Sequence, residues 1–152
     1  MKLAEALILR ADYQKRMAQL QDRLLRNAQV QEGEAPAENP ASLLRELEKV
    51  ADDLTRLIQR INATNAASEL EADMTLSDAL AVRDVLKSKH GAYSDLAQAA
   101  TVSQDRYSKS EVKFLSAVNV SEVQARADDI ARQLRELDMR IQEANWRIVL
   151  QE

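Results

Sequence analysis

The fold is decided by the stretch VSEVQARADDIARQLRELDMRIQEANWRI, residues 120–148. Its apolar residues recur at alternating spacings of three and four positions along the whole stretch. They are Val120, Val123, Ala127, Ile130, Leu134, Leu137, Ile141, Ala144 and Ile148. This period places one narrow apolar seam along a helix, and a seam of that length has to be covered by other long helices.

The composition of the rest of the chain fits this expectation. Only two Gly, two Pro and 3% aromatic residues stand against 45% apolar and 30% charged residues, which is typical of long helices and not of sheets. A length of 152 residues suits one domain. The sequence therefore predicts a single all-α domain, residues 1–152, with long antiparallel helices in a coiled-coil-like four-helix bundle.

Local signals place the ends of the helices. Asn39 precedes a proline and is a good N-cap, Thr75 forms a capping box with Asp78, and Ser121 is the expected N-cap of the last helix. The predicted helices span residues 3–30, 40–67, 76–100 and 120–150.

Two connecting segments and one helix face complete the predicted fold. Residues 31–39, QEGEAPAEN, read as a solvated loop, and residues 101–119 as an irregular or short extended segment. Gly91 permits a kink in the third helix. The core face of that helix is expected to lie close to His90 and to comprise Ala79, Val82, Leu86, Tyr93, Leu96 and Ala100.

Several classes of protein are excluded or disfavoured. The chain has no cysteine, and therefore neither a disulfide framework nor a thiolate nucleophile. Glu5 and Arg10 interrupt the apolar run near the N-terminus, which argues against a signal peptide, and no segment has the length of a membrane span. Basic residues exceed acidic ones in residues 1–30 and acidic ones dominate residues 31–80, which indicates pairing between helices and not a nucleic-acid surface. The sequence predicts a soluble cytoplasmic protein.

No stretch carries a recognisable catalytic or cofactor signature. There is no glycine-rich phosphate loop, nucleophile elbow or dinucleotide fingerprint. His90 is the only histidine, and the Glu-x-x-His pairs of carboxylate metal sites are absent. We expect no enzyme activity, no cofactor and no metal.

Polar residues on or near the core faces are a first candidate site. Buried amides and guanidinium groups are costly unless they are hydrogen-bonded, so they usually fix the register between helices. A pocket for a small polar or phosphorylated ligand is the functional alternative. The residues are Arg10, Asn62, Asn65, Arg83 and Asn145.

A second candidate is an interface on the last helix. Outside its seam lie Met139, Trp146, Val149 and Leu150, large apolar residues for which a monomeric bundle has no use unless a loop covers them. Exposed apolar patches usually mark association surfaces, and Trp and Met are favoured at interface centres. We therefore expect a homo-oligomer that uses this face, with packing of the segment around Phe114 as the alternative.

A third candidate combines aromatic, basic and hydroxyl side chains before the last helix. Arg106, Tyr107, Lys109 and Lys113 lie outside regular helix, in a pattern that can bind nucleic acid or phosphate groups. A structured connection at one end of the bundle is the simpler interpretation, and we expect no nucleic-acid partner.

The chain resembles a small family of uncharacterised bacterial proteins sometimes labelled septicolysin-like. The resemblance rests on INATN at 61–65, TLSDAL at 75–80 followed by Arg83 and Asp84, residues 106–113, and RELD at 135–138 followed by IQEANW at 141–146. It implies an all-helical, coiled-coil-rich protein without an established activity, and it supplies no functional residues. A cytolysin would need an export signal or a segment that inserts into a bilayer, and the sequence shows neither.

The sequence thus favours a non-enzymatic helical protein that acts through protein contacts, first with its own copies. A membrane-active protein and a bundle that binds a small ligand are the alternatives.

Overall fold

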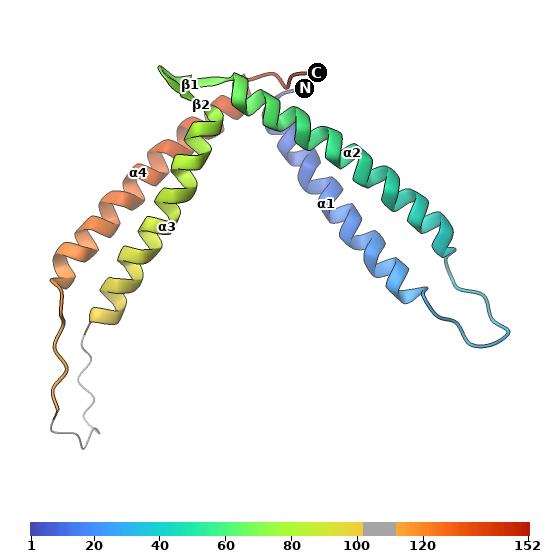
Figure 1. The fold of residues 1–152 in the computed structure, drawn as a ribbon, viewed down its shortest axis with the longest axis horizontal. Helices are drawn as coiled ribbons and strands as arrows, with labels where there is room; N and C mark the ends of the chain where they lie inside the picture. The colour runs from blue at the N-terminus through green and yellow to red at the C-terminus, as the bar shows by residue number, and fades with distance from the viewer. Residues whose placement is uncertain (102–111) are drawn as a thin grey trace. The chain divides into compact units, whose positions relative to one another are not determined.

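The computed structural model describes residues 1–101 and 112–152, and in these ranges the chain forms four long helices (Figure 1). They are α1 (Leu3–Arg26), α2 (Pro40–Ala67), α3 (Leu76–Ala100) and α4 (Val120–Arg147). Two short strands, β1 (Glu69–Glu71) and β2 (Met74–Thr75), form a small hairpin between α2 and α3. The all-α class with long helices packed against each other is confirmed. Residues 112–119 contain neither helix nor strand, as expected for the segment before the last helix.

The chain divides into two compact units, and each is described by itself. Unit 1 comprises Met1–Glu69 and Gln142–Glu152, and unit 2 comprises Leu70–Ile141. Each unit contains an antiparallel pair of helices: α1 with α2 in unit 1, and α3 with the part of α4 up to Ile141 in unit 2. The single domain expected from the sequence stays a prediction.

Unit 1 has a core of large aliphatic side chains between α1 and α2. Leu20, Leu43 and Val50 are buried together, and they contact partly buried Tyr13 and Met17 among others. Figure 1 shows the two helices side by side. The apolar residues of both helices follow the three-four spacing expected from the sequence, so the hairpin buries one continuous face.

Both ends of the chain are tied into unit 1. The backbone N–H of Leu3 donates to the carbonyl of Ile148 and that of Leu150 donates to the carbonyl of Met1, each at 3.0 Å. The N–H of Gln151 donates to the hydroxyl of Thr64, again at 3.0 Å. The chain ends therefore close on each other and on α2.

The inner seam of α3 in unit 2 agrees with the predicted core face except at two positions. Val82 and Leu96, which the sequence assigned to the core face of α3, are exposed, whereas Ala97 is buried. The more buried residues of α3 again follow a three-four spacing, which is hidden in the sequence because it includes two polar residues. This inner seam is Leu76, Ala79, Arg83, Leu86, His90, Tyr93, Ala97 and Ala100.

All four helices start at the predicted residues, and the predicted N-cap is confirmed in two cases and wrong in one. The side chain of Asn39 accepts from the N–H of Ala41, and Thr75 and Asp78 form the expected capping box. At α4 the cap is Asn119 and not Ser121, because the Asn119 side chain accepts from the N–H of Glu122 at 3.1 Å. The first helical residue is therefore one position after the cap, as usual.

The helix ends are earlier than expected for α1 and α4. Helix α1 ends at Arg26 and not near residue 30, and Asn27 is its C-cap, with its side-chain amide donating to the carbonyl of Arg23 at 2.8 Å. Helix α4 ends at Arg147, since the next residues form the backbone bonds with the N-terminus. Gly91 lies within a continuous α3, so no helix break occurs there.

Candidate interaction surfaces

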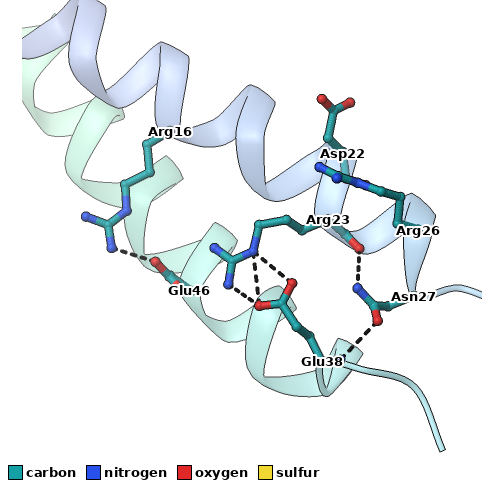
Figure 2. A network of polar contacts seen from close by, with 7 residues as sticks. All are labelled: Arg16, Asp22, Arg23, Arg26, Asn27, Glu38 and Glu46. Atoms are coloured by element: carbon teal, nitrogen blue, oxygen red, sulfur yellow. Dashed lines mark hydrogen bonds and ion pairs between the residues drawn. The ribbon is translucent and has the colours of Figure 1, made fainter.

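A polar cluster lies at the loop end of the unit 1 hairpin. The guanidinium of Arg23 donates to both carboxylate oxygens of Glu38, with Nε at 3.2 and 3.0 Å from them, and its Nη2 also donates to Glu38. The side chain of Asn27 accepts from the backbone N–H of Glu38 at 3.0 Å while it donates to Arg23 (Figure 2). Three residues therefore tie the end of α1 to the residue before the cap of α2.

One further ion pair crosses the same hairpin. Arg16 of α1 donates to Glu46 of α2 at 2.5 Å (Figure 2). The excess of basic residues in the first helix and of acidic residues after it thus serves pairing between the two segments, as expected. Hydrogen bonds from Arg23 hold the pKa of the Glu38 carboxyl below its usual range. These side chains are used within the hairpin, which favours a role in register over a role in ligand binding.

The predicted polar site is not assembled into one hydrogen-bonded network. Within the described part of unit 1, no hydrogen bond joins Arg10, Asn62, Asn65 and Asn145 to one another, and Asn62 is exposed. Asn145 is buried. The ligand site that these residues would form stays a prediction.

Arg83, the member of that set in unit 2, lies in the inner seam of α3. Its Nη1 donates to Asp138 of α4 at 3.2 Å, so it joins the two helices of unit 2. Its Nε is buried and has no hydrogen-bond partner among the described residues, and lies 3.8 Å from the carboxylate of Asp84. A long cation in a seam beside small alanines sets the register of the pair at a cost in desolvation.

The residues of the predicted interface separate into exposed and buried ones. Met139 is 72% exposed, Trp146 58% and Val149 60%, whereas Leu150 is only 5% exposed. Helix α4 ends before Val149, and the extended chain alternates its side chains, which turns Val149 outward and Leu150 inward. Leu150 therefore does not belong to an exposed surface.

Most of the aromatic and basic segment lies outside the described residues. This holds for Arg106, Tyr107 and Lys109. Lys113 is described and exposed, and so is Phe114 beside it.

Sequence reasoning missed an exposed apolar row on α3. Val85 is 67% exposed, and it lies between Val82 and Leu96 on one side of the helix. The opposite side of the hairpin is an open polar hollow. There, Ser94 and Gln98 of α3 and the C-cap residue Thr101 face α4, which contributes Ser121, Gln124 and Asp128. The signal was present in the three-four spacing of the row, but Val82 and Leu96 were assigned to the core and Val85 was not assigned to a face.

Two structural findings bear on chemistry and membranes. In residues 1–101 and 112–152, no group of three or more His, Asp or Glu side chains is placed to hold a metal ion. None of the helices in these ranges combines the length and the apolar character needed to cross a bilayer.

Comparison with known proteins places the chain in a family. Residues 10–150 match a family of unknown function, DUF6847. The chain belongs to the DUF6847 family. No curated protein matches it.

A solved structure is similar to this DUF6847 chain over almost its whole length. It is the crystal structure of a functionally unknown conserved protein from Corynebacterium diphtheriae, which is 47% identical, covers 99% of each chain and gives a TM-score of 0.95. The family relation expected from the sequence is thus shown at the level of a family of unknown function. Neither comparison carries the septicolysin-like label.

Proposed function

We propose that this DUF6847 chain is a non-enzymatic cytoplasmic protein that acts through contacts with other polypeptide chains, first with copies of itself. The observation that carries the proposal is the pair Trp146 and Val149 in unit 1, which are both more than half exposed. Trp is enriched in the centres of interfaces, where its large ring supplies contact area at a low entropic cost.

The chain holds this apolar pair in a fixed position. Val149 is paired with Lys2 in an antiparallel bridge, and the Lys2 ammonium donates to the carbonyl of Arg147 at 3.0 Å. Trp146 lies in the last turn of α4, directly before these contacts. A surface that is ordered before binding loses little conformational entropy when a partner covers it, which supports a contact role.

The test is the solution mass of the full chain by size-exclusion chromatography with light scattering, for the wild type and for Trp146→Glu. We expect an oligomer whose mass Trp146→Glu lowers while the helical circular dichroism is unchanged. Arg147→Glu, at the neighbouring position on α4, is the control and should keep the mass. A wild-type monomer would contradict self-association.

A further inference from the structure

One side of the unit 2 hairpin carries a mostly apolar row of residues on α3. Each residue of this row directly precedes a residue of the inner seam in the sequence. We name this row the α3 stripe, and all of its residues are exposed. It consists of Val82, Val85, Lys89, Ala92, Leu96 and Ala99. At 1.5 Å per residue it is roughly 25 Å long.

The same side of the hairpin carries a charged row on α4. In the polar hollow, the residues that follow the two seams face each other, for example Gln98 of α3 and Gln124 of α4. The residues that precede the two seams therefore meet on the opposite side of an antiparallel pair. On α4 these are Glu122, Arg126, Asp129, Gln133, Glu136 and Arg140, which we name the α4 charged row.

The α3 stripe is symmetric about one level of the helix. If a second copy of the stripe runs antiparallel to the first, Val82 meets Ala99, Val85 meets Leu96 and Lys89 meets Ala92. The midpoint of each of these pairs lies between His90 and Gly91. Larger apolar residues then meet each other or an alanine, and the one charged residue meets a small one. The stripe is therefore complementary to an antiparallel copy of itself.

The α4 charged row has the same property in its charges. Against an antiparallel copy of this row, Glu122 meets Arg140, Arg126 meets Glu136 and Asp129 meets Gln133. The midpoint of each of these pairs is Ala131. Two of these pairs have opposite charges and the third joins an acid to an amide. No like charges meet.

The two midpoints lie at one level of the hairpin. The hydrogen bond between Arg83 and Asp138 sets the register of α3 and α4. Because the helices are antiparallel, counting the same number of residues forward from Arg83 and backward from Asp138 reaches neighbouring positions, and here these are His90 and Ala131. A single two-fold axis across the helices therefore satisfies both rows at once. An isologous dimer requires this kind of self-complementary surface.

We propose that two copies of this chain pair through this side of unit 2, with α3 antiparallel to α3 and α4 antiparallel to α4 of the second copy. The pairing rests on the proposed function only in that both assign contacts between copies of the chain, and it adds a second contact surface, in unit 2, to the Trp146 and Val149 pair of unit 1. It covers the α3 stripe with the same stripe of the second copy and converts two helix pairs into a four-helix bundle. The other two-fold arrangement would lay the apolar stripe on the charged row.

The charges of the α4 row already have partners within the chain. Asp129 accepts from Arg132 at 2.6 Å and Arg140 donates to Glu71 at 2.5 Å. Ion pairs between exposed side chains contribute little and exchange readily, so they leave the row available to a second copy. In the dimer they select the orientation, whereas the apolar stripe supplies most of the affinity.

Crosslinking tests the register directly, because the chain has no native cysteine. In Val85→Cys/Leu96→Cys, a short bismaleimide should give a covalent dimer in which the thiol at position 85 is joined to the thiol at position 96 of the other copy. Within one copy these positions are about 16 Å apart along the helix axis, beyond the reach of a short linker. Asp84→Cys/Gln98→Cys, which places both thiols on the polar side of α3, is the matched control and should stay monomeric on denaturing gels.

Charge reversal tests the orientation. Arg126→Glu and Glu136→Arg should each weaken the dimer about tenfold, since each creates two like-charge contacts across the axis. The double variant should restore the affinity to within about threefold of the wild type, because each new acid again meets a base of the other copy. Residues 126 and 136 are too far apart along α4 to pair within one copy, so only an intermolecular contact explains the rescue.

The outcomes separate this pairing from the proposed function. Crosslinks of residue 85 to residue 96 together with charge rescue would support the pairing, and they should persist in Trp146→Glu because Trp146 lies in unit 1. An oligomer that Trp146→Glu dissociates, but that gives no such crosslink or joins position 85 to position 85 of the other copy, would overturn the pairing and leave the proposed function standing. A monomeric wild type at every concentration measured would overturn both.

Discussion

The two helical hairpins of this chain differ in the side chains that lie between their helices. In unit 1, leucines from both helices meet, ion pairs join α1 to the segment before α2 and to α2 itself, and the chain ends close the opposite end. In unit 2, the inner seam contains Arg83 and small alanines, and valines and a leucine lie outside it. Both units leave large apolar side chains exposed, such as Trp146 in unit 1 and Val85 in unit 2, so each has surface left for a partner.

The largest expected effect is in the unit 1 core. Leu20 is 1% exposed, so Leu20→Ala removes a buried side chain and leaves a cavity, which should lower the free energy of unfolding by about 3 kcal/mol. Urea unfolding followed by the fluorescence of Trp146, the only tryptophan, measures this in unit 1.

Leu25→Ala is the matched control on the same helix, because Leu25 is exposed. It should change the free energy of unfolding by less than about 0.5 kcal/mol. Equal effects of the two substitutions would show that the leucine core does not dominate unit 1.

A smaller loss is expected where the C-terminus meets α2. The hydroxyl of the fully buried Thr64 accepts from the N–H of Gln151 and donates to the carbonyl of Arg60 at 2.7 Å. Thr64→Val keeps the shape but leaves the Gln151 N–H without its acceptor, which should cost about 1 to 2 kcal/mol. Amide exchange at Gln151 should accelerate at the same time.

Thr55→Val provides the comparison for that hydroxyl. Thr55 also donates to the carbonyl four residues before it, at 2.9 Å, but it is exposed on α2 and accepts no bond from the C-terminus. Its replacement should leave the exchange at Gln151 unchanged. Faster exchange in both variants would mean that α2 as a whole had been weakened.

In unit 2 the turn of the small hairpin offers a backbone test. Asp73 has a φ of 63°, in the left-handed region that costs a β-branched residue about 1 to 2 kcal/mol. Asp73→Val should therefore lower the midpoint of thermal unfolding measured by circular dichroism. Asp73→Gly should match or exceed the wild type, and a loss with glycine would contradict a purely conformational role.

The smallest effect is the pH dependence of the unit 1 hairpin. Because Arg23 holds the pKa of Glu38 below its usual range, the folded state binds the Glu38 proton less tightly than the unfolded state does. The stabilisation is thus fully present above the ordinary pKa of a glutamate and is lost as the pH falls through the lowered pKa.

Glu38→Gln should flatten this part of the pH profile of stability, measured by urea unfolding at a series of acidic pH values. Glu48→Gln, at an exposed position of α2, is the control and should keep the wild-type profile. The carbon chemical shift of the Glu38 carboxyl should titrate below its usual range. An unchanged profile in Glu38→Gln would show that the pair with Arg23 does not form in solution.

Much of the secondary structure followed from local signals. The bounds of α2 and α3 agree with the expected ranges, since Asn39 and the Thr75 and Asp78 pair fix the helix starts by contacts within a few residues. The seam of α4 is also the more buried face of that helix, as its unbroken spacing predicted. Signals of this kind act over one or two turns and need no tertiary partner.

The errors arose where distant contacts decide. Asn27 ends α1 early because its side chain is shared between Arg23 and the backbone of Glu38, which come from two segments of the hairpin. Leu150 turns inward because α4 stops to form backbone bonds with the N-terminus. Neither event leaves a mark in the local hydrophobic pattern.

By itself, the sequence determined the all-α class, the helices and the seam of the last helix, because hydrophobic period and capping are local properties. Only the tertiary structure decided which of two neighbouring rows of α3 faces inward, since both have the three-four spacing. The register of α3 against α4 places Arg83 beside Asp138, and this turns the alanines inward and Val82, Val85 and Leu96 outward. The choice depends on a partner helix about 55 residues away in the chain, which no local pattern encodes.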